Sequence, residues 1–141
     1  MDESRLYLQE AMDSGTVVRA EILHEDGSVW ASAGRPLTTE EEGGRLVGLF
    51  EAPADAIGTG ITVGEVTYVA AEADRRLLHG RHGSAGVVAV RNPPYVVVGL
   101  YEEGRRPEDA VLTLGNLADR LADRSRQTPA PDTGTAIPSP P

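Results

Sequence analysis

Helical periodicity of the apolar residues predicts a helix near each end of the chain. Within residues 4–12, Leu8, Ala11 and Met12 fall on one helical face. The last helix is predicted to begin at Pro107, a favoured first position, and its apolar face continues to about residue 124. Acidic residues at the start of this helix and arginines at its end both complement the helix dipole.

A third helix is predicted over residues 38–50. Thr38 and Glu41 match a capping box at its start. Pro53 prevents its continuation, because proline disfavours helical angles in the residue before it. Gly43 and Gly44 weaken this helix by about 1 kcal/mol each relative to alanine.

Alternation of apolar and polar residues predicts strands in the rest of the chain. A half-buried strand over residues 16–24 and a return strand over 28–31 flank Asp26-Gly27, a strong hairpin signal. Five later strands are predicted over residues 61–63, 65–71, 76–82, 86–91 and 95–101. Because their turns are short, they form an antiparallel meander. The element order predicts an α+β fold, with helices packed on one antiparallel sheet.

Length and composition are those of one folded domain. The chain has 141 residues, of which 40% are hydrophobic and 25% charged. Residues 128–141 hold five of the ten prolines, so we expect a proline-rich disordered tail after a domain at residues 1–127. The absence of cysteine excludes disulfides, thiolate metal sites and cysteine catalysis. No apolar run approaches the roughly 18 residues of a membrane span, and the acidic start is unlike a signal peptide, so a cytoplasmic protein is expected.

The charge distribution favours an acidic partner for the second half of the chain. A net charge of −9 argues against nucleic-acid binding, because the phosphates would be repelled. Residues 1–74 carry 4 Arg and 15 acidic residues (4 − 15 = −11), whereas residues 75–141 carry 9 Arg and 7 acidic residues (9 − 7 = +2). Every basic residue is arginine, whose planar guanidinium suits carboxylates.

The sequence shows no catalytic or metal-binding motif. A strand directs His79 and His82 to opposite faces, so we interpret them as two surface histidines flanking a turn, with no metal. The glycine-rich residues 80–86 are followed by a strand, whereas a phosphate loop leads into a helix. The acids at positions 40–42 lie in a first helical turn, where acids are favoured. We expect neither an enzyme nor a cofactor.

Aromatic residues are few, at 4% of the chain. Trp30, the only tryptophan, lies on a hairpin strand, and Tyr7 lies on the first helix. Either Trp30 fills the core, or an exposed Trp–Tyr pair binds proline-rich peptides, whose rigid extended form docks on flat aromatic surfaces.

Four blocks of the sequence resemble the profilin family, small proteins that bind actin monomers. The blocks are residues 22–31, 58–61, 79–86 and 98–103, and their spacing resembles that of plant-type profilins over residues 4–124. The resemblance implies a profilin-like central antiparallel sheet, with N- and C-terminal helices packed on one face and short helices on the other. A composition rich in Ala, Gly and Arg without Lys indicates a GC-rich genome, and leaves a divergent or prokaryotic member open.

The resemblance implies a polyproline-binding groove formed by the terminal helices and the hairpin tryptophan. Tyr7 and Trp30 match groove positions, whereas Ser4 and Arg120 stand where the family has an early tryptophan and a helix tyrosine. If each lost aromatic contributes about 1 kcal/mol or more, affinity for polyproline falls by well over about tenfold. Weak or absent binding of proline-rich peptides is therefore expected.

The resemblance also implies an actin-binding surface on the later strands and the start of the last helix. Arg81 matches a basic position there, flanked by His79 and His82, and Arg105 and Arg106 match the loop before the helix. Histidines stand where stronger cations are usual, so a weak, salt-sensitive interaction with monomeric actin or an actin homologue is expected. The alternative is that these are ordinary solvated side chains.

Several alternatives stay open. Residues 138–141 either occupy the groove in cis, helped by high effective concentration, or reach a neighbouring molecule, or belong to a plain disordered extension. The arginine clusters are compatible with phosphoinositides. The alternative class of protein is a roadblock-like or PAS-like sensor or dimerisation domain without actin binding. A profilin would be a monomer. An enzyme would need a deep pocket. The expected function is stoichiometric binding of actin monomers that regulates actin assembly in the cytoplasm.

Overall fold

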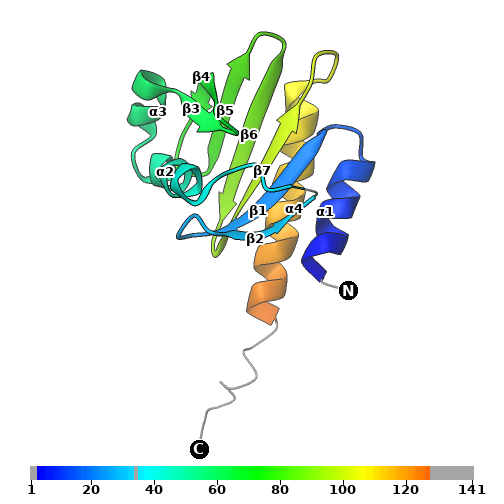
Figure 1. Ribbon diagram of the computed structural model, residues 1–141. Coiled ribbons are helices and arrows are strands. Elements are labelled where there is room, and N and C mark those ends of the chain that lie inside the picture. Colours follow the sequence, from blue (N-terminus) through cyan, green and yellow to red (C-terminus); the bar gives the residue numbers. More distant parts are fainter. Residues whose placement is uncertain (1–2, 34, 128–141) are drawn as a thin grey trace, which may run out of the picture.

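A seven-stranded antiparallel sheet runs through the middle of the computed structural model, in the strand order β2-β1-β7-β6-β5-β4-β3 (Figure 1). The structure describes residues 3–33 and 35–127, without the side chains of residues 3, 4 and 127. The strands are β1 (Arg19–His24), β2 (Val29–Ser32), β3 (Ile61–Val63), β4 (Val66–Ala73), β5 (Leu77–His82), β6 (Ala85–Asn92) and β7 (Tyr95–Tyr101). The helices are α1 (Glu3–Asp13), α2 (Glu40–Glu51), α3 (Pro53–Thr59) and α4 (Pro107–Gln127).

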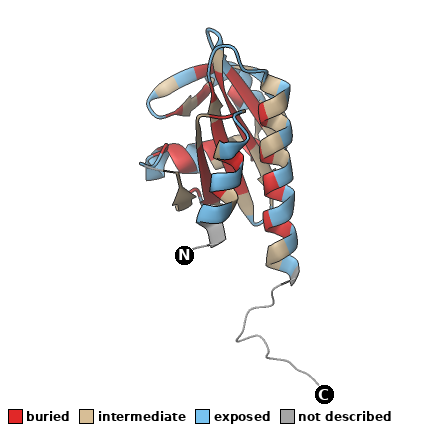
Figure 2. Ribbon diagram, turned by 90° about the vertical axis from the view of Figure 1, so that its right-hand side faces the viewer, coloured by how far each residue is buried: buried red, intermediate tan, exposed pale blue. Residues whose placement is uncertain are grey.

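Helices cover both faces of the sheet. The terminal helices α1 and α4 pack on one face, and α2 and α3 lie on the other (Figure 1). The buried positions of α4 face the sheet, and its outer side is exposed (Figure 2). Two apolar cores result, one under α1 and α4 around Leu114 and Tyr101, and one under α2 and α3 around Phe50 and Leu78. The predicted α+β architecture is therefore confirmed.

Strand β1 is buried on both faces, so the prediction of a half-buried strand was wrong. Glu21 is fully buried, with 0% of its surface exposed. Its two carboxylate oxygens accept hydrogen bonds from the backbone N–H of Leu37 and from the hydroxyl of Thr38, each 2.8 Å long. Burial, the larger effect, raises the pKa of the Glu21 carboxyl, although both hydrogen bonds oppose the rise.

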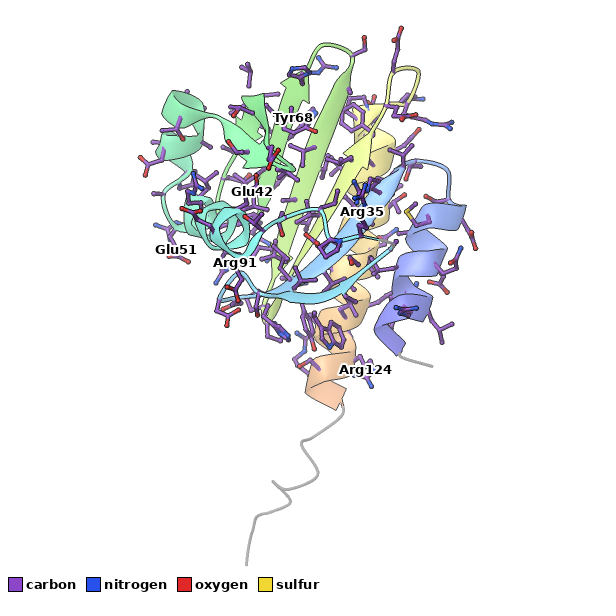
Figure 3. All side chains as sticks on the ribbon, in the orientation of Figure 1. Arg35, Glu42, Glu51, Tyr68, Arg91 and Arg124 are labelled. Atoms are coloured by element: carbon purple, nitrogen blue, oxygen red, sulfur yellow. The ribbon has the colours of Figure 1, made fainter. Side chains whose placement is uncertain are left out.

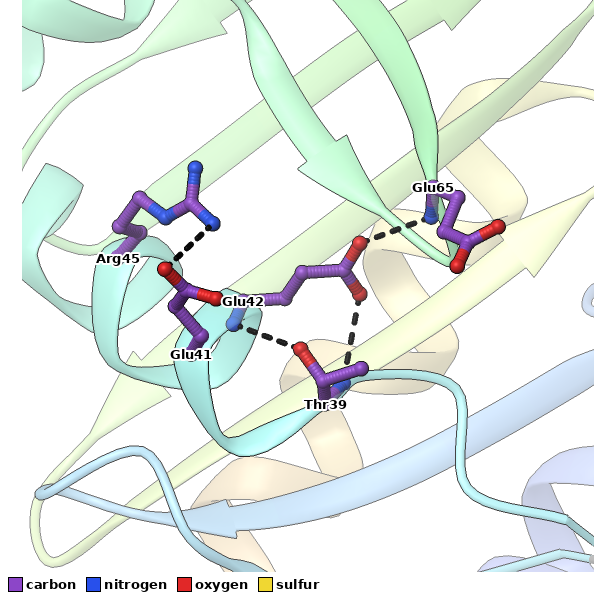
Figure 4. Close-up of polar contacts among 5 residues, drawn as sticks. All are labelled: Thr39, Glu41, Glu42, Arg45 and Glu65. Atoms are coloured by element: carbon purple, nitrogen blue, oxygen red, sulfur yellow. Dashed lines mark hydrogen bonds and ion pairs between the residues drawn. The ribbon is translucent and has the colours of Figure 1, made fainter.

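The capping box of α2 lies one residue later than predicted. Thr39 is the N-cap, and its hydroxyl accepts a hydrogen bond from the backbone N–H of Glu42, while the Glu42 carboxylate accepts one from the N–H of Thr39 (Figure 4). Both threonine–glutamate pairs fit the motif, but Thr38 donates its hydroxyl to Glu21 instead. Glu42 also accepts hydrogen bonds from the backbone N–H groups of Gly64 at 3.0 Å and Glu65 at 2.8 Å, which fixes the β3–β4 turn to α2.

Helix α3 was not predicted from the periodicity of the sequence, although the family resemblance implied short helices on this face of the sheet. Pro53 ends α2, as expected, but it also occupies the start of α3, where the missing N–H of proline costs nothing. The proline-rich residues 128–141 and the suggested placement of 138–141 in the groove lie outside the described residues.

Candidate functional site

Arg106 pairs with the carboxylate of Glu108, and the positive charge of Arg81, on another element, also acts on that carboxylate. Arg81 lies near the end of β5, and Arg106 directly precedes α4. The Arg106 guanidinium lies 3.2 Å from the Glu108 carboxylate, in a pair that is mostly exposed. The pKa of Glu108 is lowered first by its backbone hydrogen bond, then by the hydrogen bond from Arg106, and further by the charges of Arg106 and Arg81. The charges of the two arginines therefore act on the same carboxylate.

Exposed apolar side chains border these charges. Val69 of β4 pairs with Arg81 in the sheet register, so both side chains project from the same face, and 74% of Val69 is exposed. Leu112 is one helical turn beyond Glu108 on α4 and is 64% exposed. We call the surface formed by Val69, Arg81, Arg105, Arg106, Glu108 and Leu112 the arginine wall. Arg105 is exposed next to Arg106.

His79 is not on this surface, which corrects the prediction of two surface histidines. It is only 9% exposed, and its Nε2 atom lies 2.7 Å from the hydroxyl of Tyr101. Burial, followed by the charge of Arg81, lowers the pKa of His79, and Glu72 partly opposes this. A strand with both faces covered buries a residue that alternation alone would leave at the surface.

His82 projects to the other face of the sheet. Its ring meets Tyr68 edge to face, at 6.1 Å between ring centroids, and Tyr68 belongs to the core under α2 and α3. The predicted opposite orientation of His79 and His82 is therefore confirmed. Of the five residues expected to form the actin-binding surface, Arg81, Arg105 and Arg106 are exposed, whereas His79 is buried and His82 projects to the other face of the sheet.

Much of the positive charge of the second half is used in ion pairs away from the wall. Arg91 of β6 lies 3.3 Å from Glu25 and 3.8 Å from Glu51, which joins the first hairpin turn to α2 (Figure 3). Arg75 pairs with Glu51, and Arg126 pairs with Asp123. The guanidinium of Arg81 has no ion pair within 4.0 Å among the described residues, so it is available to an acidic partner.

Tyr7 and Arg120 meet between α1 and α4. The Arg120 guanidinium lies over the Tyr7 ring, 4.9 Å from its centroid, and pairs with the Glu10 carboxylate one turn further along α1. The hydrogen bond from Arg120, more than its charge, lowers the pKa of Glu10. Two of the predicted groove residues are therefore in contact, and Glu10, which the sequence did not single out, joins them.

Trp30 stacks on Tyr95, a residue missed in the groove prediction. The ring centroids lie 4.7 Å apart at an interplanar angle of 13°. Trp30 is the extra residue of a β-bulge, since Ile22 pairs with Ala31 and Leu23 with Val29. Trp30 and Tyr95 both pack at the edge of the core under α1 and α4 and stay partly exposed. The side chain of Ser4, the remaining predicted groove residue, lies outside the described residues.

The described residues offer little for catalysis. No group of three or more His, Asp or Glu side chains within residues 3–33 and 35–127 could hold a metal ion. A cavity of about 500 Å³ between α2, α3 and β3 is lined by the charged Glu42, Arg45 and Asp55, together with leucine, glycine and threonine residues. Within the described part of the chain, no helix is both long enough and apolar enough to span a bilayer.

The sequence model of the family described as "Profilin" matches residues 5–126. The chain belongs to the profilin family. Profilin-1 of Dictyostelium discoideum is 31% identical over 118 residues, which cover 83% of this profilin and 94% of that protein. Profilin-1B of Acanthamoeba castellanii is 38% identical over 109 residues, which cover 77% and 86%. The solved structure of Acanthamoeba castellanii profilin IB has a TM-score of 0.77 and 35% identity, covering 84% of this chain and 95% of that one.

Family membership settles two points about this profilin. Profilins act by binding and not by catalysis, so the prediction that the chain is not an enzyme is confirmed. The roadblock-like or PAS-like alternative is excluded, because the family match covers nearly the whole described chain.

The pairing of Trp30 with Tyr95 had only a weak signal in the sequence, the position of Tyr95 at the start of a strand.

Proposed function

We propose that this profilin binds actin monomers one to one through the arginine wall, and thereby regulates actin assembly in the cytoplasm. The observation that carries the proposal is that the charges of Arg81 and Arg106 both act on the exposed carboxylate of Glu108, with the exposed Val69 paired to Arg81 and the exposed Leu112 one turn from Glu108. Charged side chains around exposed apolar ones are typical of protein interfaces. The solved complex of LokiProfilin2 with rabbit actin shares the fold, at a TM-score of 0.67 and 13% identity.

Charge reversal on the wall tests this proposal. Arg81→Glu and Arg106→Glu should each weaken binding to actin monomers by about tenfold or more, because opposite charges would become like charges at close range. Arg45→Glu is the matched control, since Arg45 is about as exposed as Arg106 but lies on α2, on the other face of the sheet. Binding is measured by sedimentation equilibrium with monomeric actin. Unchanged affinity in both wall variants would exclude the wall as the actin site.

Salt dependence supplies a second test of the same surface. An interaction that rests on exposed guanidinium groups weakens as ionic strength rises, because the charges are screened over a shorter distance. We expect wild type and Arg45→Glu to lose affinity in parallel as salt is added, and Arg81→Glu to show a shallower slope. The same measurement gives the mass of the free protein, for which a monomer is expected.

We further propose that this profilin binds polyproline weakly. Each of its two predicted aromatic platforms already has one ring face in contact with the protein itself: Arg120 lies over Tyr7, and Tyr95 stacks on Trp30. A proline ring would have to displace these contacts or use the remaining edges. Titration with decaproline, monitored by calorimetry and by Trp30 fluorescence, should show no saturation at micromolar peptide. Micromolar affinity would contradict the proposal.

We propose that the folded domain binds actin without the proline-rich residues 128–141. The arginine wall involves β4, β5 and the start of α4, whereas these residues follow the far end of α4. A chain ending at residue 127 should therefore bind monomeric actin as the full chain does. A loss of actin affinity on truncation would assign the C-terminal segment a role in that interface.

A further inference from the structure

We propose that Arg120, held by Glu10, is a latch that covers the Tyr7 platform and competes in cis with proline-rich ligands. The inference rests on the proposed weak polyproline binding and supplies its cause. If the loss of an aromatic side chain were the only cause of weak binding, the platform would be smaller but the Tyr7 ring face would be uncovered. A latch leaves Tyr7 intact and lowers affinity by occupying its ring face, so breaking the latch should restore binding.

The Arg120 guanidinium lies over the face of the Tyr7 ring, where a bound ligand would lie. It lies 4.9 Å from the centroid of the Tyr7 ring, within the distance at which a cation is attracted to an aromatic face. Proline rings bind to aromatic surfaces by contact with the same ring faces. Arg120 and a proline ring therefore compete for one surface.

Glu10 gives the latch its hold. Its carboxylate accepts the hydrogen bond from Arg120 across the gap between α1 and α4. The contact lowers the pKa of Glu10 and raises that of Arg120, so both partners keep their charge at neutral pH. The guanidinium is thus attracted to the carboxylate and to the ring at once.

The Arg120 side chain has room to move away from the Tyr7 ring. Arg120 and Glu10 have 52% and 60% of their side-chain surfaces exposed, so neither is locked by packing. Two shallow hollows, of about 190 and 220 Å³, both have Tyr7, Glu10 and Arg120 in their lining. When the ion pair breaks, the arginine side chain can leave the ring without disturbing the core.

The test is calorimetric titration of the full-length chain with decaproline, in wild type, Glu10→Gln and Arg120→Met. Glu10→Gln removes the charge that holds the guanidinium, and Arg120→Met removes the guanidinium but keeps an apolar stem. Each should bind decaproline on the order of three- to tenfold more tightly than wild type, the effect of losing an exposed ion pair or cation–π contact. Added salt should tighten binding to wild type and leave Glu10→Gln unchanged, because only wild type has the ion pair to screen.

The matched control is the ion pair between Arg126 and Asp123, which lies on the same helix, is similarly exposed and covers no aromatic ring of the described residues. Asp123→Asn and Arg126→Met should leave decaproline affinity unchanged. Equal affinity in wild type and both latch variants, no binding in any of them, or weaker binding by Arg120→Met would overturn the latch. Tight binding by wild type with still tighter binding by the variants would overturn the proposed weak binding and leave the latch standing.

Discussion

The carbonyl oxygen of Gly27 lies where a side chain on Gly43 would have to be. A Cβ atom built on Gly43 would approach that oxygen to 2.1 Å, far inside any real contact. The first turn of α2 therefore packs directly on the turn of the β1–β2 hairpin, backbone against backbone. Gly43, which weakens its own helix by the rules of helix propensity, is the residue that permits this packing.

Alanine substitutions in this glycine pair should act in opposite directions. Gly43→Ala is expected to destabilise the protein by roughly 1–3 kcal/mol, the usual cost of overpacking. Gly44→Ala should stabilise it by up to about 1 kcal/mol, because nothing lies within 4 Å of an added Cβ there and alanine favours the helix. Free energies of unfolding from urea titrations would show the difference. Stabilisation by both substitutions would mean that the hairpin turn can withdraw from α2.

Patterns within one element were predictable from the sequence, and contacts between distant elements were not. Ile61–Val63 and Tyr95–Tyr101 match the prediction to the residue, because alternation and turn residues mark both ends of each strand. The seven-residue α3 is too short to show a helical period. The Trp30–Tyr95 stack depends on β7 pairing with β1, which local sequence does not encode.

In the candidate surfaces too, contacts between distant elements were not predictable from the sequence. Sequence resemblance placed Arg81, Arg105 and Arg106 on one surface; all three are exposed, and the charges of Arg81 and Arg106 both act on the Glu108 carboxylate. The resemblance did not foresee that His79 is buried or that Glu10 holds Arg120. Both depend on which side chains face each other across the packed layers, a property of tertiary packing.

Glu21 should make folding stability depend on pH. Burial raises the pKa of its carboxyl in the folded state above the ordinary value of 4.5, so the folded protein favours the protonated form. This contribution is fully present below the unfolded-state pKa and is lost as the pH rises through the folded-state pKa. The difference in free energy of unfolding between wild type and Glu21→Gln, measured from about pH 4 to pH 7, should therefore shift against wild type as the pH rises. A difference that stays constant with pH would contradict the assignment.

The charge of Arg81 should be measurable through His79. Burial and the Arg81 guanidinium both lower the pKa of His79 below 6.5, so this histidine contributes stability that is present above its unfolded-state pKa and lost as the pH falls through its folded-state pKa. Replacing Arg81 by Gln removes one of the two causes. The pKa of His79, followed by NMR of the imidazole ring, should rise towards its ordinary value in Arg81→Gln and stay unchanged in Arg45→Gln. If both variants titrate like wild type, Arg81 does not face His79.

Glu41 and Glu42 are neighbours with different contacts: Figure 4 shows Glu42 hydrogen-bonded to Thr39 and Glu65, and Glu41 beside Arg45. Glu42 is 6% exposed and accepts backbone hydrogen bonds from Thr39, Gly64 and Glu65, which joins the start of α2 to the β3–β4 turn. Glu41 only approaches Arg45, at 3.7 Å, and 82% of its side-chain surface is exposed.

Glu42→Ala should therefore lower the free energy of unfolding by about 2–4 kcal/mol, since it removes a helix cap and leaves two further N–H groups without their charged acceptor. Glu41→Ala should have little effect, because an exposed ion pair of this kind contributes little. Thr39→Ala, which removes only the capping hydroxyl, should fall between them at about 1 kcal/mol. Urea unfolding of the three variants measures the order. If Glu42→Ala cost no more than Thr39→Ala, the hydrogen bonds to the β3–β4 turn would contribute nothing to stability, and Glu42 would act as a helix cap alone.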